Sequence, residues 1–199
     1  MVWQWRGPDA PTVIYHHGNR EDPFAMGRFS KQSFKDVFVD SPEPIPANVV
    51  AVRAPFHDVS FRQYMARMGY LADFVAMVAV STAVVEGLVA DAHEVTTGPV
   101  TVSGISLGGW VVNLHRTLYD TADAYVPLLA GAALDDLFLE SAFRHVTSER
   151  ARSHPETLRS VLNFEDAFEA VTTDDVYPLL ARYDRIIRYD RQKRCYGDR

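Results

Sequence analysis

A Gly-x-Ser-x-Gly motif, Gly104-Ile105-Ser106-Leu107-Gly108, constrains the fold of this 199-residue chain more than any other feature. Residues 99–103 before it are mainly β-branched and follow a glycine, which predicts a short buried strand. After it, Trp110, Val111, Leu114 and Leu118 recur at helical spacing. Ser106 is therefore predicted to lie on a sharp strand-to-helix turn, where Gly104 and Gly108 remove the Cβ atoms that would collide. The plainer interpretation is a glycine-rich turn in which Ser106 only caps the helix.

Extended and helical segments alternate along the rest of the chain. Residues 12–16, 48–53, 125–130 and 176–181 are predicted to be extended, and residues 29–38, 61–92 and 107–119 to be helical. This alternation predicts an α/β fold, a three-layer α/β/α sandwich around a mostly parallel sheet, with residues 1–199 in a single domain. Ligands gather at the carboxyl ends of such strands, and His17, His57, Ser106 and Asp184 each follow one.

Residues 135–173, called the cap below, are predicted to form two or more amphipathic helices inserted between strands. They are expected either to cover Ser106 as a small helical cap or to serve only for packing. If they cover the serine, apolar cap residues would line an acyl pocket: Phe143, Leu162, Phe164 and Phe168.

Composition excludes several classes of function. A net charge of -6 without a basic stripe argues against a nucleic-acid partner. The uncharged apolar run 74–85 is shorter than the ~18 residues that span a bilayer, and no metal-binding spacing of histidine or cysteine occurs. The single cysteine, Cys195, is compatible with a reducing cytoplasm. We therefore expect a cytoplasmic protein without a membrane span, a metal or another cofactor.

Taken together, these features resemble the α/β-hydrolase superfamily over nearly the whole chain. The resemblance makes Ser106 the nucleophile and matches the family's His-Gly pair to His17 and Gly18. It implies an oxyanion hole formed by the backbone N–H groups of Asn19 and Leu107. The family's catalytic acid is matched first by Asp184, with Asp135 and Asp136 as alternatives and an N-cap role as the competing interpretation of Asp184.

The chain departs from the family in its histidines. The family places its catalytic histidine after the acid, whereas all seven histidines here precede Asp184. One explanation is that the sequence lacks the end of a longer native protein, in which case a chain stopping at Arg199 is expected to self-associate as a homo-oligomer or to aggregate. Another is a displaced base, namely His57, His145 or His154. The third is a protein that has kept the scaffold and lost the chemistry.

The resemblance implies hydrolysis of an ester, a thioester or an amide of a small-molecule acyl substrate. The reaction would proceed through an acyl-serine intermediate on Ser106 and would need no cofactor. The alternative from a different class is a catalytically impaired or non-catalytic binding protein on the same fold.

Overall fold

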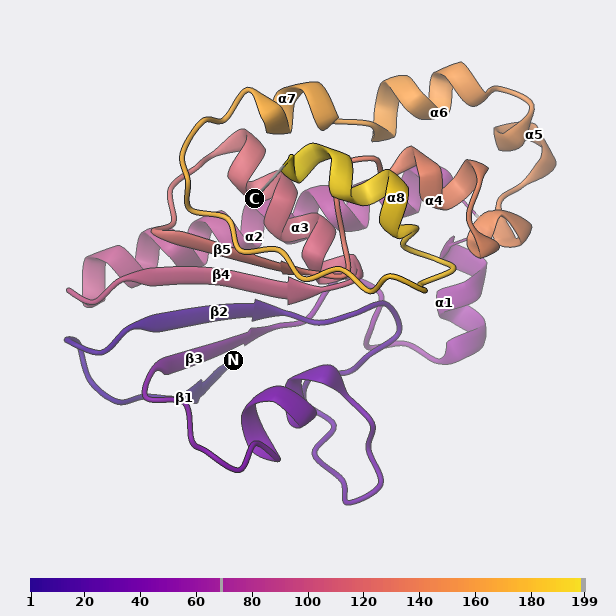
Figure 1. The fold of residues 1–199 in the computed structure, drawn as a ribbon. Helices are drawn as coiled ribbons and strands as arrows, with labels where there is room; N and C mark the ends of the chain where they lie inside the picture. The colour runs from indigo at the N-terminus through magenta and orange to yellow at the C-terminus, as the bar shows by residue number, and fades with distance from the viewer. Residues whose placement is uncertain (69, 198–199) are drawn as a thin grey trace.

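The chain folds around a five-stranded sheet in a computed structural model that describes residues 1–68 and 70–197. The strands are β1 (Val2–Gln4), β2 (Thr12–His16), β3 (Asn48–Val52), β4 (Val100–Ile105) and β5 (Ala124–Leu128). Their order is β1-β3-β2-β4-β5, with β1 antiparallel to β3 and all other neighbours parallel. The predicted α/β fold with a mostly parallel sheet is confirmed (Figure 1).

The sheet is extended at its β5 edge by a segment that lacks the regularity of a named strand. Val176 and Leu179 form parallel bridges to Tyr125 and Leu128. The amide of Leu179 donates to Pro127 O at 3.0 Å, and the amide of Leu129 donates to Leu179 O at 2.7 Å. The predicted extended run 176–181 therefore does lie parallel to β5, and the chain leaves it at the carboxyl end of the sheet.

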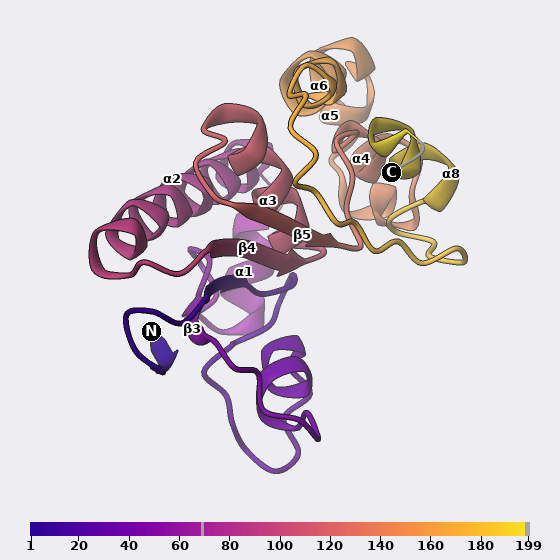
Figure 2. The same cartoon turned by 60° about the vertical axis from the view of Figure 1, so that its left-hand side comes forward.

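Both faces of the sheet are covered, but unequally. Helices α2 (Leu71–Val95) and α3 (Leu107–Leu118) cover one face, and a π-helical turn, η1 (Lys35–Val39), lies on the opposite side with its flanking loop (Figures 1 and 2). Strand alternation divides the core accordingly. Ile14 joins the large cluster under α2 and α3, whereas the next residue, Tyr15, packs with Phe34 in the smaller cluster on the other face.

The helices differ from the sequence prediction in two places. Residues 61–92 form two helices, α1 (Phe61–Met68) and α2, and residue 69 of the predicted single helix lies outside the described residues. Of the predicted helix 29–38, only residues 33–38 are helical, mostly within the π-helical turn η1. Helix α2 is long and apolar enough to cross a bilayer, a property that core helices of globular proteins share, and one side of it packs on α3 and the sheet.

The cap consists of short helices between β5 and the edge segment. They are α4 (Asp135–Leu139), the 3₁₀ turn η2 (Ala142–Val146), α5 (Glu149–Arg152), α6 (Pro155–Leu162) and α7 (Glu165–Glu169). The chain then returns beside the cap as α8 (Tyr189–Gln192) and a 3₁₀ turn, η3 (Lys193–Tyr196), as Figure 2 shows. The cap and the C-terminal elements thus lie over the same end of the sheet as the loop after β4.

Candidate active site

Ser106 occupies the turn between β4 and α3 in a strained backbone conformation, with φ 53° and ψ −108°. A Cβ atom on Gly108 would lie 2.1 Å from His16 O, and one on Gly104 would lie 2.6 Å from the carbonyl carbon of Gly108. Both contacts are with backbone, so neither can be relieved by a rotamer change. The motif therefore needs glycine on both sides, and the turn has the geometry of a nucleophile elbow.

Two backbone amides near Ser106 are candidates for an oxyanion hole. Leu107 begins α3, where the first N–H groups have no acceptor within the helix and the positive end of the helix dipole lies. The amide of Asn19 has no hydrogen-bond partner in the described part of the chain, although both neighbours are engaged. Gly18 N–H donates to Glu21 and Arg20 N–H donates to His57. Asn19, Ser106 and Leu107 all line one cavity.

His17 has a structural position. Its Nε2 accepts the N–H of Ala54 at 2.9 Å, so the ring proton is on Nδ1, which donates to Gly18 O at 2.6 Å. Burial, with smaller contributions from His16 and His57, lowers the pKa of His17 to about 2. A neutral ring with both nitrogens engaged cannot take a proton from Ser106, and it instead ties the loop after β2 to the loop after β3.

His16, the last residue of β2, lies against His17, although alternation along a regular strand would place neighbouring side chains on opposite faces. The two rings stack with their centroids 5.1 Å apart, because His17 lies just beyond the end of β2, where alternation no longer applies. His16 Nδ1 donates to His17 O at 3.0 Å, and its buried Nε2 has no partner among the described residues.

None of the three histidines proposed as displaced bases lines the cavity of Ser106 in the described chain. His57 is close to it, but its Nδ1 donates to Pro55 O and its Nε2 accepts from Arg20, both at 3.0 Å. Burial lowers the pKa of His57. His145 and His154 are exposed on the cap.

Asp184 follows the edge segment at the carboxyl end of the sheet, where the resemblance places the acid. Its Oδ1 accepts the N–H groups of Ile186 at 2.7 Å and Ile187 at 3.0 Å. This is the arrangement of a capping side chain. The carboxylate thereby fixes a turn whose two isoleucines line the cavity, and no histidine contacts it among the residues described.

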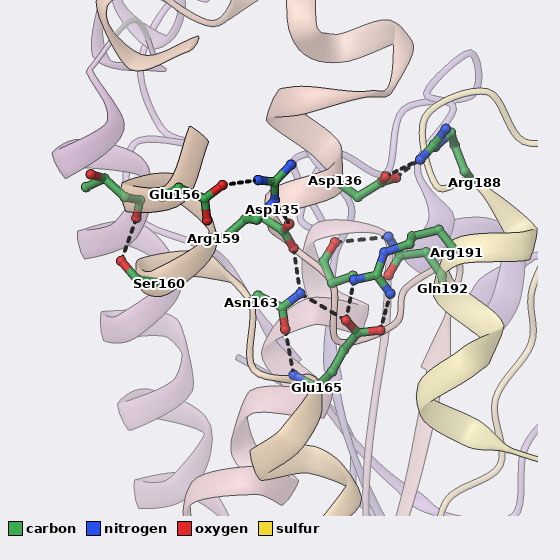
Figure 3. A network of polar contacts seen from close by, with 12 residues as sticks. Asp135, Asp136, Glu156, Arg159, Ser160, Asn163, Glu165, Arg188, Arg191 and Gln192 are labelled. Carbon is green, nitrogen blue, oxygen red and sulfur yellow. Dashed lines mark hydrogen bonds and ion pairs between the residues drawn. The ribbon is translucent and has the colours of Figure 1, made fainter. Parts of the chain in front are cut away.

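The alternative acids belong to a polar network that joins the cap to α8 (Figure 3). Asp136 forms a two-pronged ion pair with Arg188, and Glu165 forms another with Arg191. Asp135 accepts from Asn163 at 3.0 Å, and its burial raises its pKa. Burial also acts to raise the pKa of Glu165, but hydrogen bonds from Arg191 and Asn163 outweigh it and leave that pKa lowered. Asp136 and Glu165 therefore hold α8 and the residue before it against the cap, whereas Asp135 bonds within the cap.

The cavity above Ser106 encloses about 520 Å³. Phe143 lines it, as predicted, together with Leu137 and Phe138 of α4. The prediction was wrong for three other cap residues: Leu162 and Phe168 are buried in the core, and Phe164 packs against Trp110. The remaining apolar lining comes mainly from α1, α3 and the turn after the edge segment, namely Phe61, Tyr64, Met65, Met68, Phe74, Trp110, Ile186 and Ile187.

Sequence reasoning missed the side chains that hold the loop after β2, which carries the candidate oxyanion donor Asn19. Glu21 accepts Gly18 N–H at 2.9 Å and also contacts Ser33, while the Tyr64 hydroxyl donates to Asn19 Oδ1. A glutamate on a loop and a tyrosine on an amphipathic helix carry no local signal of this role. Among the described residues, no group of three or more His, Cys, Asp or Glu side chains is arranged to hold a metal ion.

Solved structures with the same fold include several peptidases. An acylaminoacyl peptidase in complex with Z-Gly-Gly-Phe-chloromethyl ketone superposes with a TM-score of 0.63, at 14% identity, over 97% of this chain and 30% of the peptidase chain. An acylaminoacyl peptidase of Pyrococcus horikoshii gives 0.62 at 13% identity, over 94% and 30%. Prolyl oligopeptidase B from Galerina marginata gives 0.53 at 14% identity, over 96% and 26%.

The fold is therefore that of the α/β-hydrolases, in agreement with the resemblance seen in the sequence. At these identities the likeness establishes the fold alone, and the chain spans 30% of the length of each acylaminoacyl peptidase. No protein-family model and no curated protein sequence matches the chain.

Proposed function

We propose that the chain is a serine hydrolase that cleaves an ester, a thioester or an amide through an acyl-serine intermediate on Ser106. The observation that carries the proposal is the conformation of Ser106, a non-glycine residue at φ 53° between two glycines that no other residue can replace. Such strain is retained where it serves a site. Its position between an apolar cavity and two candidate oxyanion donors supports acyl transfer over simple helix capping.

In the proposed reaction, Ser106 Oγ attacks the substrate carbonyl and the oxygen charge that develops is stabilised by the amides of Asn19 and Leu107. One such donor typically contributes ~3 kcal/mol to lowering the barrier. The acyl chain would occupy the apolar cavity beneath Phe143 and Phe138. Attack also needs a general base, which takes the serine proton and passes it to the leaving alcohol, thiol or amine as the bond from that group to the carbonyl carbon breaks. Water then hydrolyses the acyl-serine with the help of the same base. Asp184 would act only by orienting such a base.

The second candidate is a catalytically impaired or non-catalytic binding protein. It is favoured by the lining of the cavity, to which no histidine contributes in the described chain. Loss of one member of a catalytic triad removes most of the rate enhancement but leaves the pocket intact. A pocket of this size and apolar character is sufficient to bind a small acyl compound.

Fluorophosphonate labelling read by intact mass distinguishes the two candidates. The wild-type chain is compared with Ser106→Ala and with Ser160→Ala, an exposed serine of the cap that serves as the matched control. Labelling that is retained in Ser160→Ala and lost in Ser106→Ala supports the hydrolase. If no variant is labelled while the wild type still binds a neutral apolar ligand, the binding protein is the correct assignment.

The proposal extends to the surroundings in which the chain works. It includes a small-molecule acyl substrate, action in the cytoplasm, self-association, and no cofactor, nucleic acid or membrane span. The acidic net charge supports the absence of a nucleic-acid partner, and the single cysteine supports a reducing compartment such as the cytoplasm. Size-exclusion chromatography with light scattering tests the self-association directly, and a monomer at all concentrations contradicts it.

A further inference from the structure

The loop after β2 presents one free amide between two engaged amides. Gly18 N–H donates to Glu21 Oε2 at 2.9 Å, and Arg20 N–H donates to His57 Nε2 at 3.0 Å. The N–H of Asn19 has no acceptor in the described part of the chain. An unpaired amide flanked by two anchored amides is what a preorganised oxyanion donor requires, because its direction is set before any ligand arrives.

Two side chains from other elements hold this loop. His57 comes from the loop after β3 and Tyr64 from α1, and their rings lie 4.9 Å apart. The Tyr64 hydroxyl donates to the side-chain oxygen of Asn19. His57 Nδ1 donates to Pro55 O, which fixes the proton on Nδ1 and directs the Nε2 lone pair at Arg20 N–H.

The conformation that these contacts maintain is costly. Arg20 has φ 66°, in the left-handed region, which is unfavourable for a residue with a Cβ atom. Without an acceptor for its N–H, Arg20 would relax toward a negative φ, and the peptide planes on either side would rotate. The Asn19 amide would then change its direction relative to the cavity that Asn19 lines together with Ser106.

We propose that His57 and Tyr64 are positioning residues that aim the Asn19 amide at the oxygen of a carboxylate or of a developing oxyanion. The inference rests on the proposed function, in which this amide is one of the two oxyanion donors. It assigns to His57 a role as hydrogen-bond acceptor, in place of the general-base role that the sequence left open.

The test measures binding of hexanoate and hexan-1-ol, which share a six-carbon chain but differ in the charged oxygen. The affinities and the ¹⁵N-amide shifts of Asn19 and Arg20 are followed by NMR titration of the whole chain. The variants are His57→Leu, which has no acceptor, His57→Gln, whose Oε1 can replace Nε2, and Tyr64→Phe. Tyr177→Phe, at an exposed position of the edge segment, is the matched control.

In the wild type, hexanoate is expected to shift the Asn19 amide. His57→Leu and Tyr64→Phe are expected to lower the affinity for hexanoate about tenfold and to change the affinity for hexan-1-ol by less than about twofold. His57→Gln and Tyr177→Phe should retain wild-type affinity for both ligands. A general loosening of the fold would weaken both ligands together, so equal loss of hexanoate and hexan-1-ol overturns the proposal.

The proposal is also overturned if hexanoate does not bind, if it binds without moving the Asn19 amide, or if neither variant weakens it. None of these readouts requires Ser106 to react. A chain that binds hexanoate through Asn19 but resists fluorophosphonate therefore keeps the positioning role and loses the hydrolase function. A chain that reacts with fluorophosphonate but fails the titration keeps the hydrolase function and loses this inference.

Discussion

The pair of buried histidines at the end of β2 is expected to make the stability of this protein strongly dependent on pH. His16 and His17 are both fully buried. Burial lowers the pKa of His16 to about 4 and that of His17 to about 2, from 6.5 in an unfolded chain. Below pH 6.5 the unfolded state binds protons at these rings and the native state does not. The two rings therefore leave the free energy of unfolding unchanged above pH 6.5 and lower it progressively as the pH falls below 6.5.

The size of the effect follows from the linkage relation. Each ring removes about 1.4 kcal/mol of unfolding free energy per pH unit below 6.5 until its folded pKa is reached. Between pH 7 and pH 5 this amounts to about 2 kcal/mol per ring and about 4 kcal/mol for the pair. Since a domain has a total stability of roughly 5–15 kcal/mol, the loss is large. His57 acts in the same direction, whereas Asp135, whose pKa is raised, opposes it.

Urea denaturation at pH 7 and at pH 5 measures this loss, and His16→Leu isolates the contribution of one ring. The substitution also removes the hydrogen bond to His17 O, which changes the stability at both pH values equally. The difference between the two pH values should fall by about 2 kcal/mol in His16→Leu and stay unchanged in His145→Gln, at an exposed position of the cap. An unchanged difference in His16→Leu would refute the reasoning.

Three further outcomes are expected. Gly108→Ala should lower the free energy of unfolding, measured by urea denaturation, by about 3 kcal/mol or more, because its Cβ would lie 2.1 Å from His16 O. Gly87→Ala is the control: Gly87 lies in helix α2 with nothing within 4 Å of the added Cβ, so the substitution should raise the free energy of unfolding by up to about 1 kcal/mol. Arg116→Ala should cost roughly 3–5 kcal/mol because the fully buried guanidinium serves Asp175 and three backbone carbonyls; a loss under 1 kcal/mol would contradict this. Phe143→Ala should enlarge the cavity and raise the affinity for decan-1-ol relative to hexan-1-ol about fourfold, which corresponds to ~0.8 kcal/mol for one more buried methylene. An unchanged ratio of the two affinities would place Phe143 outside the ligand site.

The parts of the fold that depend on neighbouring residues were predictable from the sequence. Residues 12–16 match β2 because a short run rich in β-branched and aromatic residues is typical of a buried strand. The turn at Ser106 was predictable because its two glycines act on atoms within a few residues of them or on the adjacent strand. Strand β1 was missed because a strand of only three residues is too short to show the alternation of apolar and polar residues that identifies a strand.

The parts that depend on distant contacts were not predictable. His57 and Arg20 are 37 residues apart, and nothing in either segment specifies that an imidazole will accept that amide. The cap shows the same limit. Helical spacing identified Leu162 and Phe168 as buried, but burial against the protein core and burial at a ligand cavity require the same apolar pattern. The bidentate partners of Asp136 and Glu165 likewise lie far along the chain, at the residue before α8 and within α8.

Four non-glycine residues with positive φ lie at one edge of the sheet: Arg20, Phe56, Ser106 and Leu129 each follow a parallel strand at its carboxyl end. At roughly 1–2 kcal/mol apiece, their summed cost is comparable with the net stability of a whole domain. Replacing Arg20, Phe56 or Leu129 by glycine should relieve this backbone strain and raise the free energy of unfolding, yet none of the three positions is glycine in this sequence. Directed evolution for thermostability alone should therefore collect glycines at this edge first, at the expense of the site that the edge carries.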